Sequence, residues 1–480
     1  MNALSRSAAP AVTFPGMPQQ PTVAVFGGTF SPPGLHHRAI VQELARLFDH
    51  VIVVPCGPRP DKPATSDVDP IYRAALADIA FRGIPKVEVD LFDLEQATFT
   101  RTHELTDRYK ERGQVWHVVG SDLLTGGALS KSFVHNTWER GPDLWRTLNF
   151  AVLKRAGHVL GPGDLPPQHK LVDVAFDGSS AVIREKLYHR ESVKGLVADD
   201  VAEYIERHRL YRPMLPARAT RIHLEHPRLL IEVADRNPKA REWAERFRKH
   251  EHPDDPNCVL VIGGDGTMLH AIQKHWRRRV PFYGLNAGHV GFLMNDAHGV
   301  MSGAFPPKDG LVSRQMPMLY AEMTTCDGQI KCGLSFNDAW IERKTGQSAW
   351  LEVKLNGQVR LPKVVCDGVL CSTAAASTAY AMSMGAQPLL ADTPAWLMVG
   401  SNVMQPLNWK SALLSLESDV EVRSLDCDKR PCNAYLHGVL MGEVTTMKVR
   451  ISRIAAAELA FNPTHDLAEK IAQVQFPRTT

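Results

Sequence analysis

The stretch that most constrains how this chain folds runs from Val259 to Ile272, just past its midpoint. Four apolar residues, Val259 to Ile262, are typical of a buried parallel strand and lead directly into Gly263-Gly264-Asp265-Gly266-Thr267. An apolar pattern of helical spacing follows. A strand, a glycine turn and a helix start predict a phosphate site, because glycine lets backbone N–H groups approach an anion at the positive end of the helix dipole. The alternative is a tight turn in which glycine supplies only a positive φ.

Three later segments narrow this prediction: Gly284-Leu-Asn286-Ala-Gly288-His-Val-Gly291, Asn337-Asp338, and the stretch from Asp367 through Thr373 to Tyr380. In this order and at these intervals the motifs resemble those of NAD kinases, which phosphorylate the 2′-hydroxyl of NAD's adenosine ribose. The resemblance implies that Asp265 orients or deprotonates that hydroxyl, or positions the phosphates and metal. It also implies nucleotide contacts from Gly264, Gly266, Thr267, Asn286, Asn337, Asp338, Thr373, Ser377, Thr378, Ala379 and Tyr380.

The chain departs from the kinase pattern at three places, one of which is Ala386-Gln387-Pro388, where the family has Gly-Gly-Pro. The family's Thr-Pro-Thr-Gly-Ser-Thr-Ala-Tyr is Thr373-Ala-Ala-Ala-Ser-Thr-Ala-Tyr380 here, and its Asp-Gly-Gln near the end is His437-Gly438-Val439. Loss of a flexible glycine and a hydroxyl is expected to change the loop around the nucleotide, and with it substrate preference. ATP and NAD are the expected substrates. Mg²⁺ is expected to arrive on the ATP phosphates, with no dedicated protein metal site.

A second nucleotide motif lies near the N-terminus. Thr22 to Phe26 reads as a strand, followed by Gly27-Gly-Thr-Phe-Ser-Pro-Pro-Gly-Leu-His-His37 and then by a helix with an apolar face, before a buried strand at Val51 to Cys56. This is a βαβ opening, whose strand-to-helix turn is the expected place for a nucleotide. Helices and strands continue to alternate through about residue 176, which predicts a doubly wound parallel sheet.

This first half resembles the nucleotidyltransferase superfamily, and within it the nicotinate or nicotinamide mononucleotide adenylyltransferases. The resemblance is carried by the first turn, by Pro60-Asp-Lys62-Pro63, by Gly120-Ser-Asp122, by Trp138 and Trp145, and by Ser179-Ser-Ala-Val-Ile-Arg184. It implies that His37 and Arg184 act on the phosphates of ATP and that Lys62 adds a further charge. Nucleotide contacts are implied for Gly27, Gly28, Thr29, Phe30, Lys62, Asp122, Ser179 and Ser180.

The first half also departs from its family. The family's first motif has Asp, His and Gly where this chain has Ser31, Gly34 and His36, so that only the second histidine, His37, is kept. The threonine of the last motif is Ala181. The family's first histidine donates to the phosphates, and its loss is expected to lower the rate of adenylyl transfer by about 10²–10³ if it acts as oxyanion-hole donors do. His36, one place away, is a candidate to compensate for this lost donor.

Length and composition set the remaining expectations. A chain of 480 residues with 44% hydrophobic and 22% charged residues is expected to form two or more globular domains. A net charge of +3 gives no electrostatic case for nucleic acid. The eight cysteines show no zinc-like spacing and no apolar run is long enough for a membrane helix, so a cytoplasmic protein with reduced thiols is expected.

The expected fold class is α/β, with a Rossmann-like nucleotidyltransferase domain followed by an NAD-kinase-like domain that has an α/β part and a β-rich part. The predicted division is a disordered tail over 1–21, the first domain over 22–212, a linker over 213–228, and the kinase domain over 229–480. Within the kinase domain the α/β part reaches about residue 316 and the β-rich part follows. By resemblance, a homo-oligomer through the kinase domain is expected.

The predicted function is bifunctional: adenylyl transfer from ATP to a nicotinate or nicotinamide mononucleotide, then ATP-dependent phosphorylation of NAD to NADP. Coupling consecutive steps favours the nicotinamide substrate, since the nicotinate product needs amidation first, whereas the bacterial type of the first domain favours nicotinate. One alternative is an NAD kinase whose first domain only binds nucleotide. Another is an active adenylyltransferase with a kinase-like domain that senses dinucleotide. The last alternative is a protein that binds nucleotides and catalyses neither reaction.

Overall fold

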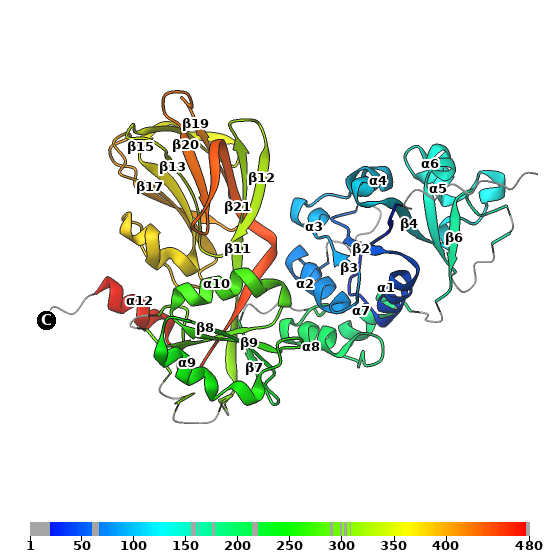
Figure 1. Cartoon of the computed structure of the whole chain (residues 1–480), viewed down its shortest axis with the longest axis horizontal. Helices are drawn as coiled ribbons and strands as arrows, with labels where there is room; N and C mark the ends of the chain where they lie inside the picture. The colour runs from blue at the N-terminus through cyan, green and yellow to red at the C-terminus, as the bar shows by residue number, and fades with distance from the viewer. Residues whose placement is uncertain are drawn as a thin grey trace, which may run out of the picture.

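The computed structural model of the chain describes residues 20–59, 67–154, 160–161, 163–174, 178–213, 219–288, 291–297, 300–301, 305–307 and 309–476. They form two units that lie side by side (Figure 1). The first unit covers the described residues up to 213, and the second covers those from 219 onward.

The first unit is built on a parallel sheet with strand order β3-β2-β1-β4-β5-β6, which confirms the doubly wound fold. Its apolar strands are buried because helices cover both faces. The strands are β1 (Thr22–Gly28), β2 (His50–Pro55), β3 (Val87–Val89), β4 (Gln114–Gly120), β5 (Asn149–Leu153) and β6 (His169–Val172). The helices are α1 (Leu35–Leu47), α2 (Pro70–Phe81), α3 (Phe92–Gln96), α4 (Thr102–Tyr109), α5 (Phe133–Thr137), α6 (Gly141–Thr147), α7 (Ser180–Tyr188) and α8 (Asp199–His208).

The second unit begins as an α/β layer and ends as an antiparallel β structure. Strands β8 (Leu229–Val233), β9 (Cys258–Gly263) and β10 (Phe282–Asn286) are parallel, with helices α9 (Pro238–Glu245) and α10 (Asp265–His275) between them. The antiparallel strands are β11 (Leu311–Thr325), β12 (Ile330–Ser335), β13 (Asp338–Arg343), β14 (Ala349–Leu355), β15 (Gln358–Cys366), β16 (Gly368–Thr373), β17 (Ala395–Ser401), β18 (Ser411–Ser415), β19 (Asp419–Ser424), β20 (Cys432–Leu436) and β21 (Val439–Phe461). Helix α12 (Leu467–Gln475) follows.

Two long strands, β11 and β21, join the two parts of the second unit (Figure 1). The end of β21 returns to the α/β layer, where Phe282 of β10 pairs with Leu459 in parallel register. The expected boundary near residue 316 therefore falls inside β11, and the last residues of the β-rich part complete the sheet of the α/β part. The physical reason is that a strand of this length spans both layers without a break.

The linker expected over 213–228 contains a strand. Residues Ala219–Ile222 form β7, which pairs antiparallel with the start of β11, so that Leu311 faces Ile222. Prolines and scattered basic residues hide this strand in the sequence because β7 lies at an edge and is held by its partner rather than by its own apolar pattern.

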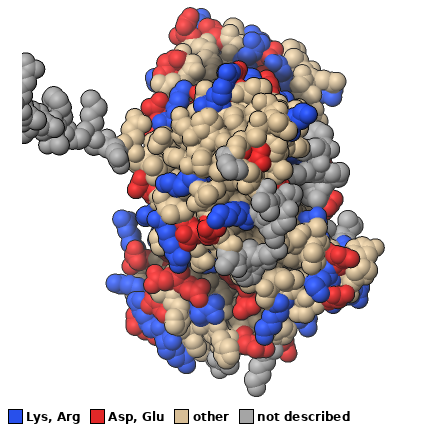
Figure 2. Space-filling view, turned by 90° about the vertical axis from the view of Figure 1, so that its right-hand side faces the viewer, with Lys and Arg blue, Asp and Glu red and all other residues tan. Residues whose placement is uncertain are grey.

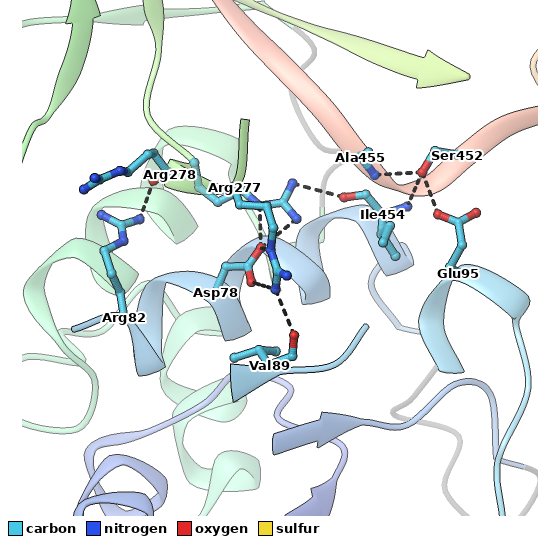
Figure 3. A network of polar contacts seen from close by, with 10 residues as sticks. Asp78, Arg82, Val89, Glu95, Arg277, Arg278, Ser452, Ile454 and Ala455 are labelled. Atoms are coloured by element: carbon cyan, nitrogen blue, oxygen red, sulfur yellow. Dashed lines mark hydrogen bonds and ion pairs between the residues drawn. The ribbon is translucent and has the colours of Figure 1, made fainter. Parts of the chain in front are cut away.

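The two units are fastened by buried charges. Asp78, on α2, is buried and accepts hydrogen bonds from Arg277 and Arg279 of the second unit, at 2.5 Å and 3.0 Å (Figure 3). Arg279 also donates to the backbone carbonyl of Ile454 in β21, at 3.0 Å. The carboxylate of Asp78 thus holds two guanidinium groups that follow α10.

A second cluster joins α3 to β21. Buried Glu95 accepts a hydrogen bond from the hydroxyl of Ser452 at 2.6 Å (Figure 3). The Glu95 carboxylate also pairs with Arg450. Further along β21, buried Glu458 accepts from His208 of α8 and from Ser313, each at 3.0 Å. Each of these carboxylates is buried and paired with a residue of the other unit. The two units therefore pack against each other through buried polar contacts instead of being joined only by a linker.

The surface charges follow the balanced composition. On the face shown in Figure 2, lysine and arginine side chains alternate with acidic ones, and neither sign forms a continuous field. Among the helices that the structure describes, none is both long and apolar enough to cross a membrane.

Candidate nucleotide sites

A cavity of about 1040 Å³ opens at the carboxyl edge of the first sheet. It lies by β1 and β4, where the strand order changes direction, which is where ligands bind in open α/β sheets. Its volume is at the top of the range of roughly 300–1,000 Å³ for ligand pockets. The structure brings eight of the sequence-predicted residues to its wall: Gly27, Gly28, Thr29, Phe30, His37, Asp122, Ser179 and Ser180.

His37 stands in the first turn of α1 with a defined orientation. The backbone N–H of Gly34 donates to its Nδ1 at 3.1 Å. In a neutral ring this places the proton on Nε2, so Nε2 is a hydrogen-bond donor. A donor at the start of a helix, where the dipole is positive, suits a phosphate oxygen.

The glycine turn after β1 is shaped by one aromatic ring. Phe30 is buried, with a positive φ of 44°, and a Cβ on Gly28 would lie 2.9 Å from its Cζ atom. Around Gly27, by contrast, no described atom lies within 4 Å of the Cβ position. Gly28 therefore makes room for the ring, while Gly27 leaves its backbone open to the cavity.

Arg73, which belongs to none of the sequence motifs, holds this turn in place. It is fully buried on α2, and its Nη2 donates to the carbonyls of Thr29 and Cys56, both at 2.7 Å. The available signal is composition: Arg73 and Asp78 are the charged residues of an otherwise apolar helix, PIYRAALADIAF. Charged groups are rarely buried without a partner, so each marks a specific contact.

Arg184 contacts the backbone of the first turn in this structure. It is outside the described lining of the cavity, and its Nη1 donates to the carbonyl of Ser31 at 2.7 Å. Nearby, the hydroxyl of Ser180 donates to the carbonyl of Pro32 at 2.9 Å. Both residues therefore tie α7 to the first turn in this structure. Lys62 lies outside the described residues.

The side wall of the cavity comes from residues without a motif. These are Arg59, Asp93, Phe99, Thr100, His117 and Phe133, and Trp138 joins them, whereas Trp145 packs in the core. Burial lowers the pKa of His117 to about 4, so this ring is neutral at pH 7. Burial also raises the pKa of Asp93.

The second glycine turn lies at the carboxyl end of β9, in the other unit. None of Gly263, Gly264 and Gly266 has a positive φ, so the tight-turn alternative does not explain them. A Cβ on Gly263 would collide with Oγ1 of Thr267, while the Cβ positions of Gly264 and Gly266 have no described atom within 4 Å. The turn is open on the side of the latter two glycines, as phosphate binding requires.

Asp265 is the first residue of α10. Its two carboxylate oxygens accept hydrogen bonds from the backbone N–H groups of Phe292 and Leu293, each at 2.9 Å. Lys470 of α12 binds the same loop through the carbonyls of Gly291 and Met294, at 2.6 Å and 2.7 Å. Burial raises the pKa of Asp265, opposed by these backbone donors and by the charge of Lys470. Asp265 thus fixes the loop after β10 and has lone pairs left for a substrate hydroxyl.

Asn286 lies beside this turn, because β10 places it next to Gly263 in parallel register. Its Oδ1 accepts from the N–H of Gly288 at 3.0 Å. His289 and Val290 of the same motif lie outside the described residues. The neighbouring strands β9 and β10 therefore end together, at Gly263 and Asn286, beside Asp265.

Asp338 is the first residue of β13, and Asn337 directly precedes it. The hydroxyl of Ser335 donates to Oδ1 of Asn337 at 2.8 Å. Asp338 is 8% exposed, and no described residue donates a hydrogen bond to its carboxylate. Burial raises its pKa to about 6. A buried carboxylate without a described partner is suited to a ligand that brings hydroxyl donors, such as a ribose.

The segment from Thr373 to Tyr380 divides into a buried and an accessible part. The hydroxyl of Thr373 donates to the carbonyl of Phe336 at 2.7 Å. That of Ser377 donates to the carbonyl of Ala374 at 2.7 Å and accepts from the N–H of Leu389 at 2.8 Å. These two hydroxyls hold the loop in place, whereas Thr378, Ala379 and Tyr380 are at least partly exposed.

The three alanines explain how the α/β part and the β-rich part meet. Ala374, Ala375 and Ala376 form a buried turn, and Ala375 belongs to the same hydrophobic cluster as Met268 of α10 and Phe336. The apolar turn thus packs the segment around Asn337 against the helix that begins at Asp265. Among the described residues, no group of three metal-ligating side chains is placed to hold a metal ion.

The fold, together with the similarities to known proteins, defines the class: a nucleotide-binding transferase. A family model of ATP-NAD kinase N-terminal domains matches residues 186–296, and one of cytidylyltransferase-like domains matches residues 25–186. The NAD kinase of Rickettsia bellii is 30% identical over 249 residues, which cover 51% of this chain and 96% of that protein. The NAD kinase of Hyphomonas neptunium is 30% identical over 261 residues, which cover 52% of this chain and 98% of that protein.

The chain belongs to the NAD kinase family, and a nucleotidyltransferase-like domain precedes its kinase part. The crystal structure of yeast NADH kinase complexed with NADH aligns over 55% of this chain and 92% of that one, with 16% identity and a TM-score of 0.47. The kinase family model begins at residue 186, although α8 packs through Val201, Tyr204 and Ile205 into the core of the first unit.

Proposed function

We propose that this chain is a bifunctional enzyme of pyridine-nucleotide synthesis. Its first site transfers the adenylyl group of ATP to a nicotinate or nicotinamide mononucleotide, and its second phosphorylates the 2′-hydroxyl of NAD with ATP. The observation that carries this proposal is the presence of two separate strand–glycine turn–helix sites, one on each sheet, after β1 and after β9.

The chemistry of the first site follows from its donors. Adenylyl transfer needs no covalent intermediate, only two phosphate groups held in line while the leaving pyrophosphate gains charge. His37 is oriented to donate from Nε2 at the wall of the cavity. The exposed backbone at Gly27 and the start of α1 add positive potential for the same phosphates.

The second site supplies groups for phosphorylation of a ribose hydroxyl. The open turn at Gly264 and Gly266 accepts the phosphates, while Asp265 orients or deprotonates the hydroxyl. Asp338 accepts hydrogen bonds from a ribose of the bound dinucleotide, because its carboxylate is buried and has no described donor. Accessible Thr378, Ala379 and Tyr380 contact the adenosine.

A one-pot assay tests both activities. The purified chain is incubated with Mg²⁺-ATP and either mononucleotide, and products are separated by chromatography. We expect NADP to accumulate from nicotinamide mononucleotide, or the deamido dinucleotide to accumulate when nicotinate mononucleotide is the accepted substrate. Consumption of neither mononucleotide together with conversion of added NAD would refute the first activity.

Two variants separate the sites. Asp265→Asn replaces one acceptor oxygen by an amide, and we expect it to remove kinase turnover while the mononucleotide is still consumed. His37→Asn should remove consumption of the mononucleotide and leave phosphorylation of added NAD intact. Asp254→Asn, at an exposed loop position, is the matched control. Loss of both activities in either variant would contradict two independent sites.

A second candidate function is a kinase whose first unit binds nucleotide without turnover. The position of Arg184, bonded to the carbonyl of Ser31 rather than lining the cavity, favours it. The same assay decides, because this candidate requires ATP binding in the first unit with no dinucleotide formed from either mononucleotide.

Three further expectations belong to this proposal. The adenylyltransferase is assigned to residues 22–212 and the kinase to 229–480, the chain acts in the cytoplasm, and it assembles as a homo-oligomer through the kinase part. Light scattering on a chromatographed sample measures the assembly, and a monomer at micromolar concentration would refute it.

A further inference from the structure

Two consecutive histidines face the cavity of the first unit. The motif resemblance implies a phosphate contact for His37, and it leaves His36 only as a candidate to compensate for the donor missing at Gly34. His36 lines the cavity together with His37, and the two ring centroids are 3.9 Å apart. The side chain of His36 is nearly buried, with 8% exposed. A buried imidazole at the wall of a phosphate site, in the first turn of a helix, is placed to contact an anion.

The space for this ring is made by two glycines from different segments. A Cβ on Gly34 would lie 2.6 Å from Nδ1 and Cε1 of His36, and a Cβ on Gly178 would lie 2.5 Å from its Nδ1. Gly34 has a φ of −98°, a value open to any residue, so its lack of a side chain is explained by the ring and not by the backbone. The ring of His36 therefore fills the volume that a side chain at position 34 would enter.

We propose that His36 is a second phosphate-binding imidazole of the first site and takes the place of a side chain at position 34. This inference rests on the proposed adenylyl transfer. In that reaction a phosphate oxygen of the mononucleotide bonds to the α-phosphorus of ATP, and the bond from that phosphorus to the bridging oxygen breaks. Pyrophosphate leaves with the electron pair. His36 donates a hydrogen bond to the phosphates as this charge develops, beside His37.

The alternative role of His36 is to fill space between the first turn and the segment of Gly178. Two substitutions separate donation from packing. His36→Phe keeps a ring of similar size but removes its donors, and His36→Gln keeps a donor without the ring. If His36 binds phosphate, His36→Phe lowers the turnover of adenylyl transfer by about 10²–10³ and His36→Gln lowers it less.

Two controls accompany this comparison. His50→Phe changes an exposed histidine at the start of β2, the opposite edge of the sheet, and should leave adenylyl transfer unchanged. Phosphorylation of added NAD by the same samples reports folding of the chain. In the reverse reaction, His36→Phe should raise the KM for pyrophosphate more than the KM for NAD, a split that a purely structural role does not predict.

A variant that exchanges the residues at positions 34 and 36 tests whether a histidine at either position can bind the phosphates. His36→Gly alone should lose transfer, and the double variant Gly34→His/His36→Gly should recover it to within about tenfold of the unaltered chain. Equal loss in the single and double variants, or a His36→Phe chain within threefold of the unaltered one, would overturn the role of His36 while leaving adenylyl transfer established. An unaltered chain that makes no dinucleotide would instead overturn the proposed function, and this inference with it.

Discussion

Replacement of Asp78 by asparagine tests whether buried charges hold the two units together. The side chain of Asp78 is 5% exposed and binds Arg279, whose side chain is 4% exposed, as well as the half-exposed Arg277. The asparagine removes the negative charge and leaves the guanidinium of Arg279 buried against a neutral amide. The carbonyl of Ile454 remains as a partner of Arg279 but carries no charge.

The magnitude follows from the burial. Breaking one side of a buried ion pair costs roughly 3–5 kcal/mol, because the remaining charge loses its compensation. At roughly 2–4 °C per kcal/mol for a domain of about 150–250 residues, we expect Tm to fall by roughly 6–20 °C. The exposed pair Asp143 and Arg146 provides the matched control, since its side chains are 57% and 69% exposed. Asp143→Asn should cost at most about 1 kcal/mol.

Thermal unfolding followed by calorimetry measures the effect, and a second variant checks its cause. In Asp78→Asn/Arg279→Met the stranded cation is removed, so this chain should be more stable than Asp78→Asn alone. A Tm for Asp78→Asn equal to that of Asp143→Asn would refute the account of the interface. A double variant less stable than the single one would show that the lost stability does not come from the uncompensated charge of Arg279.

Two further predictions concern the kinase part. Burial raises the pKa of Asp338 from 3.8 to about 6, so the folded chain binds this proton more tightly than the unfolded chain and stability falls by about 3 kcal/mol as pH rises through that interval. In urea unfolding, the Asp338→Asn chain should therefore be more stable than the unaltered chain at pH 7 but not at pH 4. Its KM for NAD should be raised. A stability difference between the two chains that does not vary with pH would contradict this prediction. Ser377→Ala leaves the N–H of Leu389 without its acceptor. We therefore expect this substitution to lower the free energy of unfolding by about 1–3 kcal/mol and to raise the KM for NAD. Ser383→Ala, at an exposed hydroxyl, should change neither quantity in the same assays, and equal effects would contradict the role of Ser377.

Helix α2 shows how far a sequence can be interpreted. The alternation of segments predicts a helix from about Ile71 to Phe81, and the structure has α2 at Pro70–Phe81, with most of its residues buried. The same segment holds two charged residues that stand out against it. Burial of a charge without a partner is costly, so the sequence indicates that partners exist, yet it does not name them. Arg73 finds two backbone carbonyls of its own unit, whereas Asp78 finds arginines about two hundred positions away.

The sequence by itself determined the local features: strands from apolar runs, glycine turns at their ends, and the order of motifs that indicates two nucleotide sites. These depend on residues close together in the chain, so spacing alone reveals them. The tertiary structure decided what depends on distant residues: the partners of Asp78, the pairing of β7 with β11, and the burial of the Ser377 hydroxyl. It also decided that the ring of His36 fills the space at Gly34, because contacts across a fold depend on packing, which no local pattern records.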